Sequence, residues 1–566
     1  MLNVDIFKIK KLFQEKRFPE IIFEIESTTS EQNRSSELCN LLGICRASQK
    51  GKTEKDVKYA LNDFENAFNK DNLGENSLDS LCNYIKLCAE MGRKESDLVN
   101  NMLTAEKMYL KAEKKFSNNI KFIGHGLDLY KYLLKHEERI SKAEKIINLT
   151  GLNELFGKIY LSTQMYINKW GQKDFAEFQK KFTKLFNVYN AKKLSKVDIN
   201  KKKIKVAFLS PDFYKDHSIT YFVKNLIKEL KNTKFETHGL SLLKTHLHDE
   251  TTKKFLSNFD NWIALGEKTD QQIVDIIQEM KIDILIDLGG LWATNRISIF
   301  NTRMCPLQIS WLGYNNSTGL KEVDFIIADK NTVKDEEKYY GTKIYKLPKI
   351  WNSHCGFNFE RKLIELPVKK NGYFTFGSLN NFRKVNEEVL DIWVKILKRV
   401  KNSKIILKSS LYVCEDVIKK KFENEGLINS VQILKKTTQD DFLSHINIYD
   451  KIDVCLDTFP YNGVTTTFEA LWKNVPVITK AGYNFNSRCG ESILKNANIE
   501  NFIARDNDDY IEKAVYYSNN INELDKVRRN LFNKIKETPL FDTKAFSNDF
   551  CEALESMQKI IIRRYK

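Results

Sequence analysis

The residues best suited to chemistry lie in the stretch 451–473, which reads KIDVCLDTFPYNGVTTTFEALWK. Its apolar run, Ile452–Leu456, is typical of a buried strand. The pair Asn462-Gly463 breaks regular structure, and apolar residues return at helical spacing from Thr465. The pattern predicts a strand, a loop and a helix whose N-terminus opens onto the loop. Unpaired N–H groups and a partial positive charge make such a terminus a phosphate site.

Two threonines and a glycine favour the same ligand. Thr465 and Thr466 add hydroxyl donors, and Gly463 lets a ligand approach the backbone closely. The alternative needs no ligand, because Thr466 and Glu469 have the spacing of a capping box.

Three further side chains have chemistry that would suit a phosphate or sugar site. His217 follows a predicted strand and begins a helix, where the imidazolium form is disfavoured and a neutral, proton-accepting ring is expected. Lys384 also stands between a strand and a helix, where its ammonium could reach a diphosphate. His445 precedes the predicted strand Ile452–Leu456, which leads into the loop before Thr465. Alternatively, each histidine is an ordinary helix cap or surface residue, and Lys384 is an ordinary exposed lysine.

Alternating strands and helices are predicted to position these residues. The pattern is that of two mostly parallel, doubly wound sheets, in which ligands bind beyond the carboxyl ends of strands. Strands are expected at 204–209, 236–242, 262–265, 284–287 and 323–328 in the first sheet, and at 373–379, 404–408, 431–434, 452–456 and 476–479 in the second.

The N-terminal third, residues 4–192, reads as consecutive helices. Leu41-Leu42-Gly43 followed by Tyr59-Ala60 and Phe64 is similar to a tetratricopeptide repeat, with its period of about 34 residues lengthened by an insert at 48–56. Two or three such degenerate repeats would either brace the rest of the chain or bind an acceptor or partner.

Composition excludes several classes of protein. The net charge of +17 is spread along the chain and accompanies no base-reading module, so nucleic-acid binding is not expected. There is no P-loop, GxGxxG motif or apolar run of membrane-spanning length. His246 and His248 lack further ligands, so no metal site is expected. Ten cysteines without a CxxC pair and no apolar signal core predict a soluble, cytoplasmic protein.

Several ordered motifs closely resemble the protein O-linked N-acetylglucosamine transferases, especially their bacterial members. The resemblance covers nearly all of residues 204–560. It is carried by Asp457–Gly463, Thr465-Thr466, Glu469–Trp472, Phe376–Asn381 with Lys384, Ser210-x-Asp212-Phe213 with His217, Asp283–Gly290, and Leu312-Gly313-Tyr314.

The resemblance implies an inverting, metal-independent transfer of a sugar, GlcNAc in this family, from a UDP-sugar to Ser or Thr of an acceptor protein. It implies catalytic roles for His217 and Lys384. The implied UDP-sugar residues are Asn381, Lys384, His445, Asn462, Gly463, Thr465, Thr466 and Glu469, and those on the sugar and acceptor side are Leu312, Gly313, Tyr314 and Tyr461.

The sequence departs from the family at four places, one of them near Asn261, where a second active-site histidine of animal members is absent. Val464 replaces the histidine of animal members, Glu469 replaces their aspartate, and Asn315-Asn316-Ser317 replaces Pro-Gly-Thr. The donor sugar therefore stays open. One alternative is an N-glucosyltransferase that uses UDP-glucose on Asn of an adhesin- or flagellin-like protein, and another is an inactive repeat scaffold.

The expected architecture is a tetratricopeptide-like all-α domain followed by two Rossmann-like domains in the GT-B arrangement. The expected boundaries are 1–200 for the helical domain, 201–365 for the sugar and acceptor side, 366–540 for UDP-sugar binding, and 541–566 for a terminal helix that packs back on the catalytic core. No oligomeric state is predicted.

Overall fold

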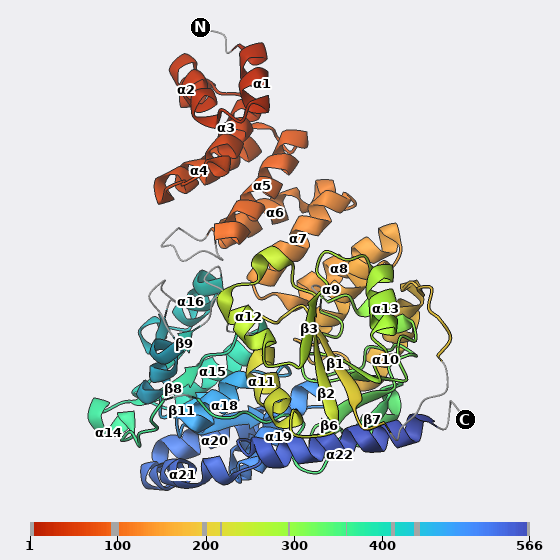
Figure 1. The fold of residues 1–566 in the computed structure, drawn as a ribbon. Helices are drawn as coiled ribbons and strands as arrows, with labels where there is room; N and C mark the ends of the chain where they lie inside the picture. Colours follow the sequence, from red (N-terminus) through yellow and green to blue (C-terminus); the bar gives the residue numbers. More distant parts are fainter. Residues whose placement is uncertain are drawn as a thin grey trace. The chain divides into compact units, whose positions relative to one another are not determined.

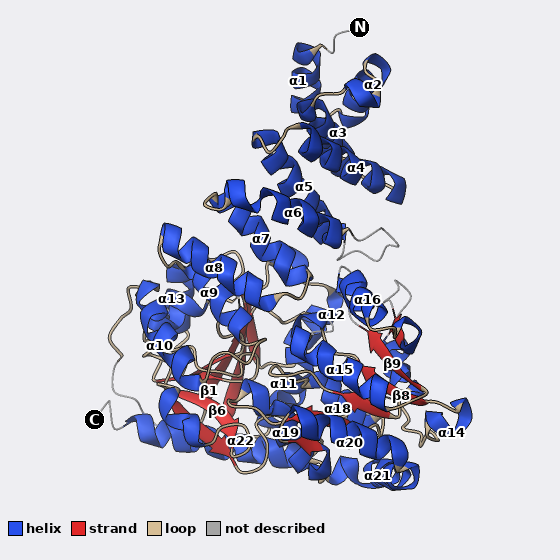
Figure 2. Cartoon of the chain, turned by 180° about the vertical axis from the view of Figure 1, so that it is seen from behind, coloured by secondary structure: helices blue, strands red, loops and turns tan. Residues whose placement is uncertain are grey.

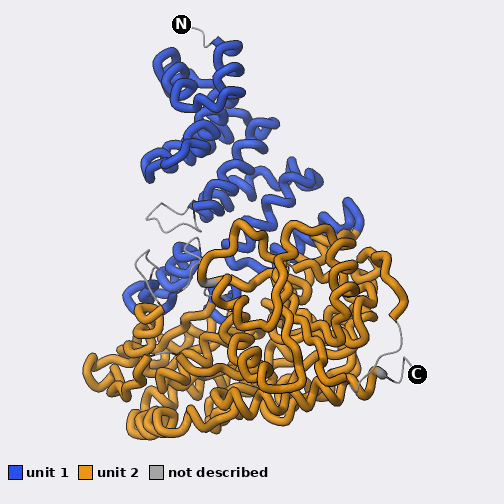
Figure 3. Tube along the Cα trace, in the orientation of Figure 1, with its two compact units in different colours: residues 1–151, 381–390, 407–440 blue, residues 152–380, 391–406, 441–566 orange. Residues whose placement is uncertain are grey.

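A computed structural model describes residues 5–91, 101–194, 201–214, 218–292, 295–357, 359–408, 414–434 and 442–562. The chain divides into two compact units (Figure 3). Unit 1 comprises residues 1–151, 381–390 and 407–440, and unit 2 comprises residues 152–380, 391–406 and 441–566.

Unit 1 is built mainly from helices that pack on their neighbours in sequence (Figure 1). Gly43 lies so close to Phe64 that an added Cβ would be 2.5 Å from its ring, which explains the glycine in the repeat-like motif. A buried ion pair joins Arg46 and Asp63 between neighbouring helices. The helices are α1 (Ile6–Gln14), α2 (Phe18–Thr28), α3 (Ser36–Ser48), α4 (Glu54–Lys70), α5 (Glu75–Met91), α6 (Met102–Phe116), α7 (Ile120–Tyr132), α8 (His136–Thr150) and α16 (Glu415–Asn424).

The first sheet lies in unit 2 and has seven parallel strands in the order β3-β2-β1-β4-β5-β6-β7. The order reverses direction between β1 and β4, as in doubly wound folds. The strands are β1 (Ile204–Ser210), β2 (Phe235–Ser241), β3 (Asn261–Ala264), β4 (Ile284–Asp287), β5 (Leu307–Ser310), β6 (Phe325–Asp329) and β7 (Lys343–Leu347). The sequence pattern missed β5 and β7.

The second sheet has the order β10-β9-β8-β11-β12-β13, and β8, β11, β12 and β13 pair in parallel. Asp457 follows β11, so the candidate loop lies beyond a strand's carboxyl end. The strands are β8 (Phe374–Ser378), β9 (Ser403–Lys408), β10 (Val431–Leu434), β11 (Val454–Leu456), β12 (Val477–Lys480) and β13 (Ile503–Ala504).

Helices flank both sheets (Figure 2). The predicted fold class, an all-α region followed by two doubly wound α/β sheets, is confirmed. The remaining helices are α9 (Glu154–Gln164), α10 (Gln172–Phe182), α11 (Ser218–Leu230), α12 (Glu250–Leu256), α13 (Asp270–Glu279), α14 (Pro367–Asn371), α15 (Glu387–Arg399), α17 (Phe442–Ile446), α18 (Thr465–Trp472), α19 (Cys489–Asn496), α20 (Asn507–Asn519), α21 (Ile521–Lys534) and α22 (Thr543–Ile562).

The long helix α22 packs on β5, β7 and α11. The rings of Trp311, which follows β5, and Phe550 on α22 lie 4.7 Å apart between centroids. Just before α22, the Leu540 carbonyl accepts a hydrogen bond of 2.9 Å from His354 N–H. The end of the chain is therefore tied to the first sheet, although it follows the second in sequence. Within the described ranges, no helix combines the length and the apolar character needed to cross a bilayer.

Candidate functional site

The loop between β11 and α18, residues 457–464, is organised by the buried carboxylate of Asp457. We call it the phosphate loop, after the ligand predicted for it. One oxygen, Oδ1, accepts hydrogen bonds from Gly463 N at 2.7 Å and Thr458 N at 2.8 Å, and Oδ2 accepts one from Thr479 Oγ1 at 2.7 Å. Asp457 is only 1% exposed. Because its acceptor capacity is filled by the protein, this carboxylate shapes the loop rather than offering itself to a ligand.

The start of α18 is free of the capping box that the sequence suggested. The N-cap is Val464, and no side chain caps the helix. Thr466 Oγ1 instead donates to Asn380 Oδ1, across the sheet, at 3.0 Å. Glu469 instead lies beside His445 and Tyr449. The capping interpretation of Thr466 and Glu469 is therefore wrong, and the first backbone N–H groups of α18 have no side-chain cap, as an anion site requires.

Gly463 occupies a place where a side chain has no room. An added Cβ would lie 2.5 Å from Thr466 Oγ1 and 2.8 Å from Asn380 Oδ1. Its neighbour Asn462 is fully buried; its amide donates to Thr458 O at 3.0 Å, and its oxygen accepts from Gly490 N at 3.2 Å. Asn462 thus fixes the loop by protein contacts on both ends of its amide.

Glu469, one turn further along α18, is buried in a cluster with two other polar side chains. Its Oε2 lies 3.0 Å from the hydroxyl of Tyr449 and 3.2 Å from Nε2 of His445. Burial and the neighbouring Glu469 charge raise the pKa of Tyr449 well above its ordinary value. The hydroxyl therefore stays protonated and donates a hydrogen bond to the Glu469 carboxylate. His445 and Glu469 are brought together, as a shared ligand would require.

A second cluster joins the phosphate loop to the first sheet. Tyr461 stacks on Tyr166, with ring centroids 5.4 Å apart, and lies 6.3 Å from the ring of Trp292. Trp292 Nε1 in turn donates to Gly313 O at 2.7 Å.

The backbone around Gly313 is unusual. Leu312 has φ of +77°, and a Cβ on Gly313 would lie 1.9 Å from Leu288 O. Tyr314 is buried, with its ring 5.8 Å from that of Trp292. Gly313 and Tyr314 therefore come together with Tyr461 around one indole, and Leu312 directly precedes them in the chain.

Asn381 and Lys384 belong to unit 1. Asn381 Oδ1 accepts from Arg383 N at 3.0 Å and caps the short turn η6 (Phe382–Lys384), which ends in the half-buried Lys384. The buried ring of His136, at the start of α8, faces the backbone of residues 383 and 385, and burial lowers its pKa to about 4. His217 lies outside the described residues.

Sequence reasoning placed Asn380 and Asp457 within the site's motifs but gave them no role, and it missed Tyr449 and Trp292. Asp457 directly follows β11 and Asn380 lies two residues after β8, so their places beyond strand ends were available as a signal. Nothing local marks Tyr449 or Trp292. Within the described ranges, no group of three or more His, Cys, Asp or Glu side chains could hold a metal ion.

Comparison with known proteins matches this chain to a family of glycosyl transferases. The model of glycosyl transferase family 41 matches residues 182–353 and 360–550. An O-GlcNAc transferase of Thermobaculum terrenum, solved as a mutant, superposes with a TM-score of 0.75 at 19% identity over 95% of this chain and all of that one, which shows the fold.

Two plant relatives are similar in sequence. The SPINDLY protein of Solanum lycopersicum, named a probable UDP-N-acetylglucosamine–peptide N-acetylglucosaminyltransferase, is 29% identical over 69% of this chain and 42% of its own length. The SPINDLY protein of Eustoma exaltatum, with the same name, is 30% identical over 60% of this chain and 38% of its own. The chain spans less than half the length of these relatives.

Two doubly wound sheets of mostly parallel strands are the GT-B architecture, and the superposed O-GlcNAc transferase shares this fold. The chain belongs to glycosyl transferase family 41.

Proposed function

We propose that this chain transfers N-acetylglucosamine from UDP-N-acetylglucosamine to Ser or Thr hydroxyls of a protein, with inversion at the sugar carbon. The observation that carries the proposal is the uncapped start of α18, where Gly463, Thr466 and Asn380 surround backbone donors suited to a diphosphate. Family membership and the names of the plant relatives support the donor and the protein acceptor.

The residues divide by role. Thr465, Thr466 and Gly463 bind the diphosphate, Glu469 binds the ribose hydroxyls, and His445 stacks near uracil. Asn462 and Asn381 shape the two donor loops. Leu312, Gly313, Tyr314 and Tyr461 face the sugar and the acceptor. The close approach of His445 to Glu469, 3.2 Å, supports a single nucleoside subsite.

In the proposed reaction, the acceptor oxygen attacks the anomeric carbon while the bond from that carbon to the β-phosphate oxygen breaks. The hydroxyl proton passes to a base, a role assigned to His217. Negative charge grows on the departing UDP, and the ammonium of Lys384 with the N–H groups of α18 stabilises it. These groups take the place that a divalent cation fills elsewhere, so the reaction needs no metal.

The location proposed for this activity is the cytoplasm. All ten cysteines are free thiols in the structure, and reduced thiols fit a reducing compartment.

The central test is a panel of UDP-sugars incubated with purified protein, read out as UDP release and as mass spectrometry of acceptor peptides. Lys384→Ala should lower turnover by about 10²–10³-fold, because one preorganised charge at the leaving group is lost. The exposed Lys401→Ala serves as a control and should retain full turnover. Activity should persist in EDTA.

Three results would contradict the proposal in different ways. Full turnover by Lys384→Ala would remove the lysine from the mechanism. Hexose on Asn would favour the N-glucosyltransferase. If the protein neither binds UDP nor releases it from any donor, the inactive scaffold is the interpretation that remains.

A further inference from the structure

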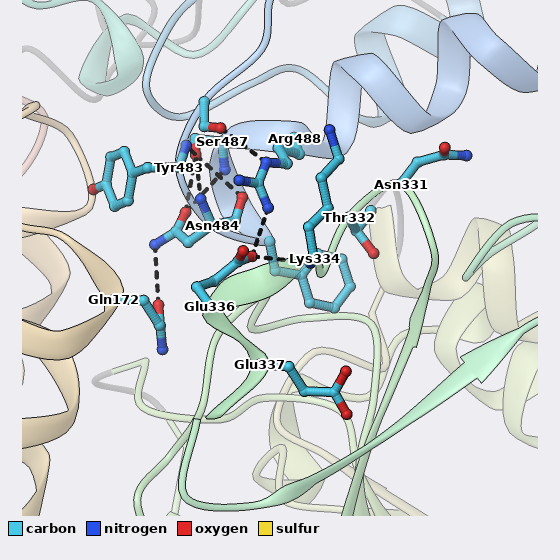
Figure 4. Close-up of polar contacts among 12 residues, drawn as sticks. Gln172, Asn331, Thr332, Lys334, Glu336, Glu337, Tyr483, Asn484, Ser487 and Arg488 are labelled. Atoms are coloured by element: carbon cyan, nitrogen blue, oxygen red, sulfur yellow. Dashed lines mark hydrogen bonds and ion pairs between the residues drawn. The ribbon is translucent and has the colours of Figure 1, made fainter. Parts of the chain in front are cut away.

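A network of polar contacts joins the first sheet's last segments to the second sheet within unit 2 (Figure 4). We call it the inter-sheet seam. On one side it contains residues 329–340, from the end of β6 through the turn η5 (Asp335–Tyr339), and on the other residues 485–492, which include the turn η10 (Asn486–Arg488) and the start of α19. Figure 4 shows the pair of Glu336 with Arg488. The other pairs are Lys334 with Glu491, Asp329 with Ser492, and Tyr340 with Phe485.

The Arg488–Glu336 ion pair of the seam is shielded from water. Arg488 Nη1 lies 2.6 Å from Glu336 Oε1, and the two side chains are only 12% and 11% exposed. The second ion pair is more open: Lys334 Nζ lies 2.7 Å from Oε1 of Glu491, but the lysine is 38% exposed and Lys495 Nζ lies at the same distance from that oxygen. Charges as well buried as those of Arg488 and Glu336 are costly without a partner, so this pair holds its two segments in a fixed relation.

Further hydrogen bonds reinforce the seam. Ser492 Oγ donates to Asp329 Oδ2 at 2.6 Å, and Phe485 N donates to the hydroxyl of Tyr340 at 2.9 Å. Gln172 of α10 accepts from Asn484 Nδ2 at 3.3 Å and donates to Asn316 Oδ1 at 2.8 Å. The loop at 482–488 is therefore held from the first sheet and from α10 at once.

The same loop is in contact with the phosphate loop. Gly490, the second residue of α19, donates its N–H to Asn462 Oδ1 at 3.2 Å. A Cβ on Gly490 would lie 2.1 Å from Thr479 Oγ1 and 3.0 Å from Asp457 Oδ2. The start of α19 thus rests on the carboxylate that holds Gly463 N.

Arg488 connects the loop 482–488 to the first sheet's segments. Besides Glu336, it reaches back with Nε to the carbonyl of Gly482 at 2.8 Å. It therefore closes the loop 482–488 onto itself and fastens it to the first sheet immediately before α19 begins at Cys489.

We propose that Arg488, through its ion pair with Glu336, is a positioning residue that holds the phosphate loop in its diphosphate-binding shape. The inference rests on the proposed UDP-sugar site, and it assigns to the first sheet a part in binding a donor that lies on the second. Arg488 acts through α19 and Asn462, and it does not touch the nucleotide.

The test compares Glu336→Gln, Arg488→Lys and Arg488→Met with the intact protein. The readouts are the affinity for UDP by calorimetry, KM and kcat for the UDP-sugar, and the melting temperature. Glu322→Gln is the matched control, because it removes a carboxylate that pairs with Arg303 at 2.6 Å within the first sheet's own segments.

We expect Glu336→Gln and Arg488→Met to weaken UDP binding and raise the donor KM about tenfold, the effect of one lost charged contact. Arg488→Lys, which keeps the charge, should fall between them and the intact protein. Glu322→Gln should leave UDP affinity unchanged even if its melting temperature falls equally. Unchanged UDP affinity in folded Glu336→Gln and Arg488→Met would overturn the inference, as would an equal loss in Glu322→Gln. If the intact protein does not bind UDP, the proposed function fails before the variants are compared.

Discussion

Individual side chains in the phosphate loop separate into those that could touch a ligand and those that shape the loop. Asp457 and Asn462 have their polar atoms occupied by protein partners. A bare carboxylate beside a diphosphate would repel it, but the Asp457 charge is satisfied by donors that include Gly463 N, Thr458 N, Thr479 Oγ1 and the Asn380 amide. The carboxylate therefore costs little binding energy and orders the backbone around Gly463.

Tyr449 plays the corresponding role for Glu469. Its hydroxyl lies 3.0 Å from Glu469 Oε2 and 3.1 Å from Thr466 O, so it holds the carboxylate against the second turn of α18. In the proposed site, that carboxylate must accept ribose hydroxyls from a fixed position.

Tyr449→Phe should raise the donor KM about fivefold, the effect of one hydrogen bond of about 1 kcal/mol, while kcat changes little. Steady-state kinetics with the donor varied measures both constants. The control is Tyr516→Phe, which removes the hydroxyl of an exposed tyrosine that donates to Glu523. A fall in kcat at unchanged KM would show that Glu469 does not act by binding the ribose.

At the scale of elements, the loop between β11 and α18 works because a glycine stands where three segments meet. Gly463 faces Thr466 of α18, Asn380 after β8, and Asp457 after β11. The hydrogen bond from Thr466 to Asn380 spans 86 residues of sequence, so its geometry depends on the sheet rather than on the local motif.

Gly463→Ala should reduce UDP affinity at least tenfold, because a Cβ 2.5 Å from Thr466 Oγ1 forces the threonine and Asn380 apart. Calorimetric titration with UDP measures the loss. Gly124→Ala, where a Cβ meets nothing within 4 Å, is the control and should bind UDP normally. Normal affinity in folded Gly463→Ala would show that the close packing at this loop does not serve the ligand.

The same scale explains what the sequence could and could not predict. Buried strands such as β1 and β4 are apolar runs that stand out against helical periodicity. β5 is as short as β4 but reads Leu-Gln-Ile-Ser, with polar residues at two of its four positions, and β7 is an edge strand with two lysines and mixed exposure, so neither run is distinctive. The threonines at the start of α18 were predicted from a local pattern. Tyr449 was not, because its role depends on a contact made in three dimensions. The domain boundaries stay a prediction.

For the molecule as a whole, the segment that connects the two sheets, between β7 and β8, contains one histidine, His354, around which other elements pack. The ring of His354 is surrounded by aromatic rings from α11, α18 and the segment before α22: Phe222 at 5.5 Å, Phe468 at 6.3 Å and Phe541 at 6.3 Å between centroids. Gly356 N donates to its Nδ1 at 3.0 Å. Elements of both sheets and the terminal helix segment therefore share one apolar cluster with a titratable centre.

This cluster should make the protein sensitive to mild acid. Burial lowers the pKa of His354 to about 4, against about 6.5 when unfolded. A group whose folded pKa is depressed below its unfolded value binds protons more readily in the unfolded chain. Its stability contribution is therefore complete above pH 6.5 and declines as the pH falls toward 4, by about 2 kcal/mol at pH 5. His354→Asn keeps an acceptor for Gly356 N but cannot titrate. Its melting temperature should fall less than that of the unsubstituted protein between pH 7 and pH 5, whereas parallel pH profiles would place the acid sensitivity in other groups, such as His136.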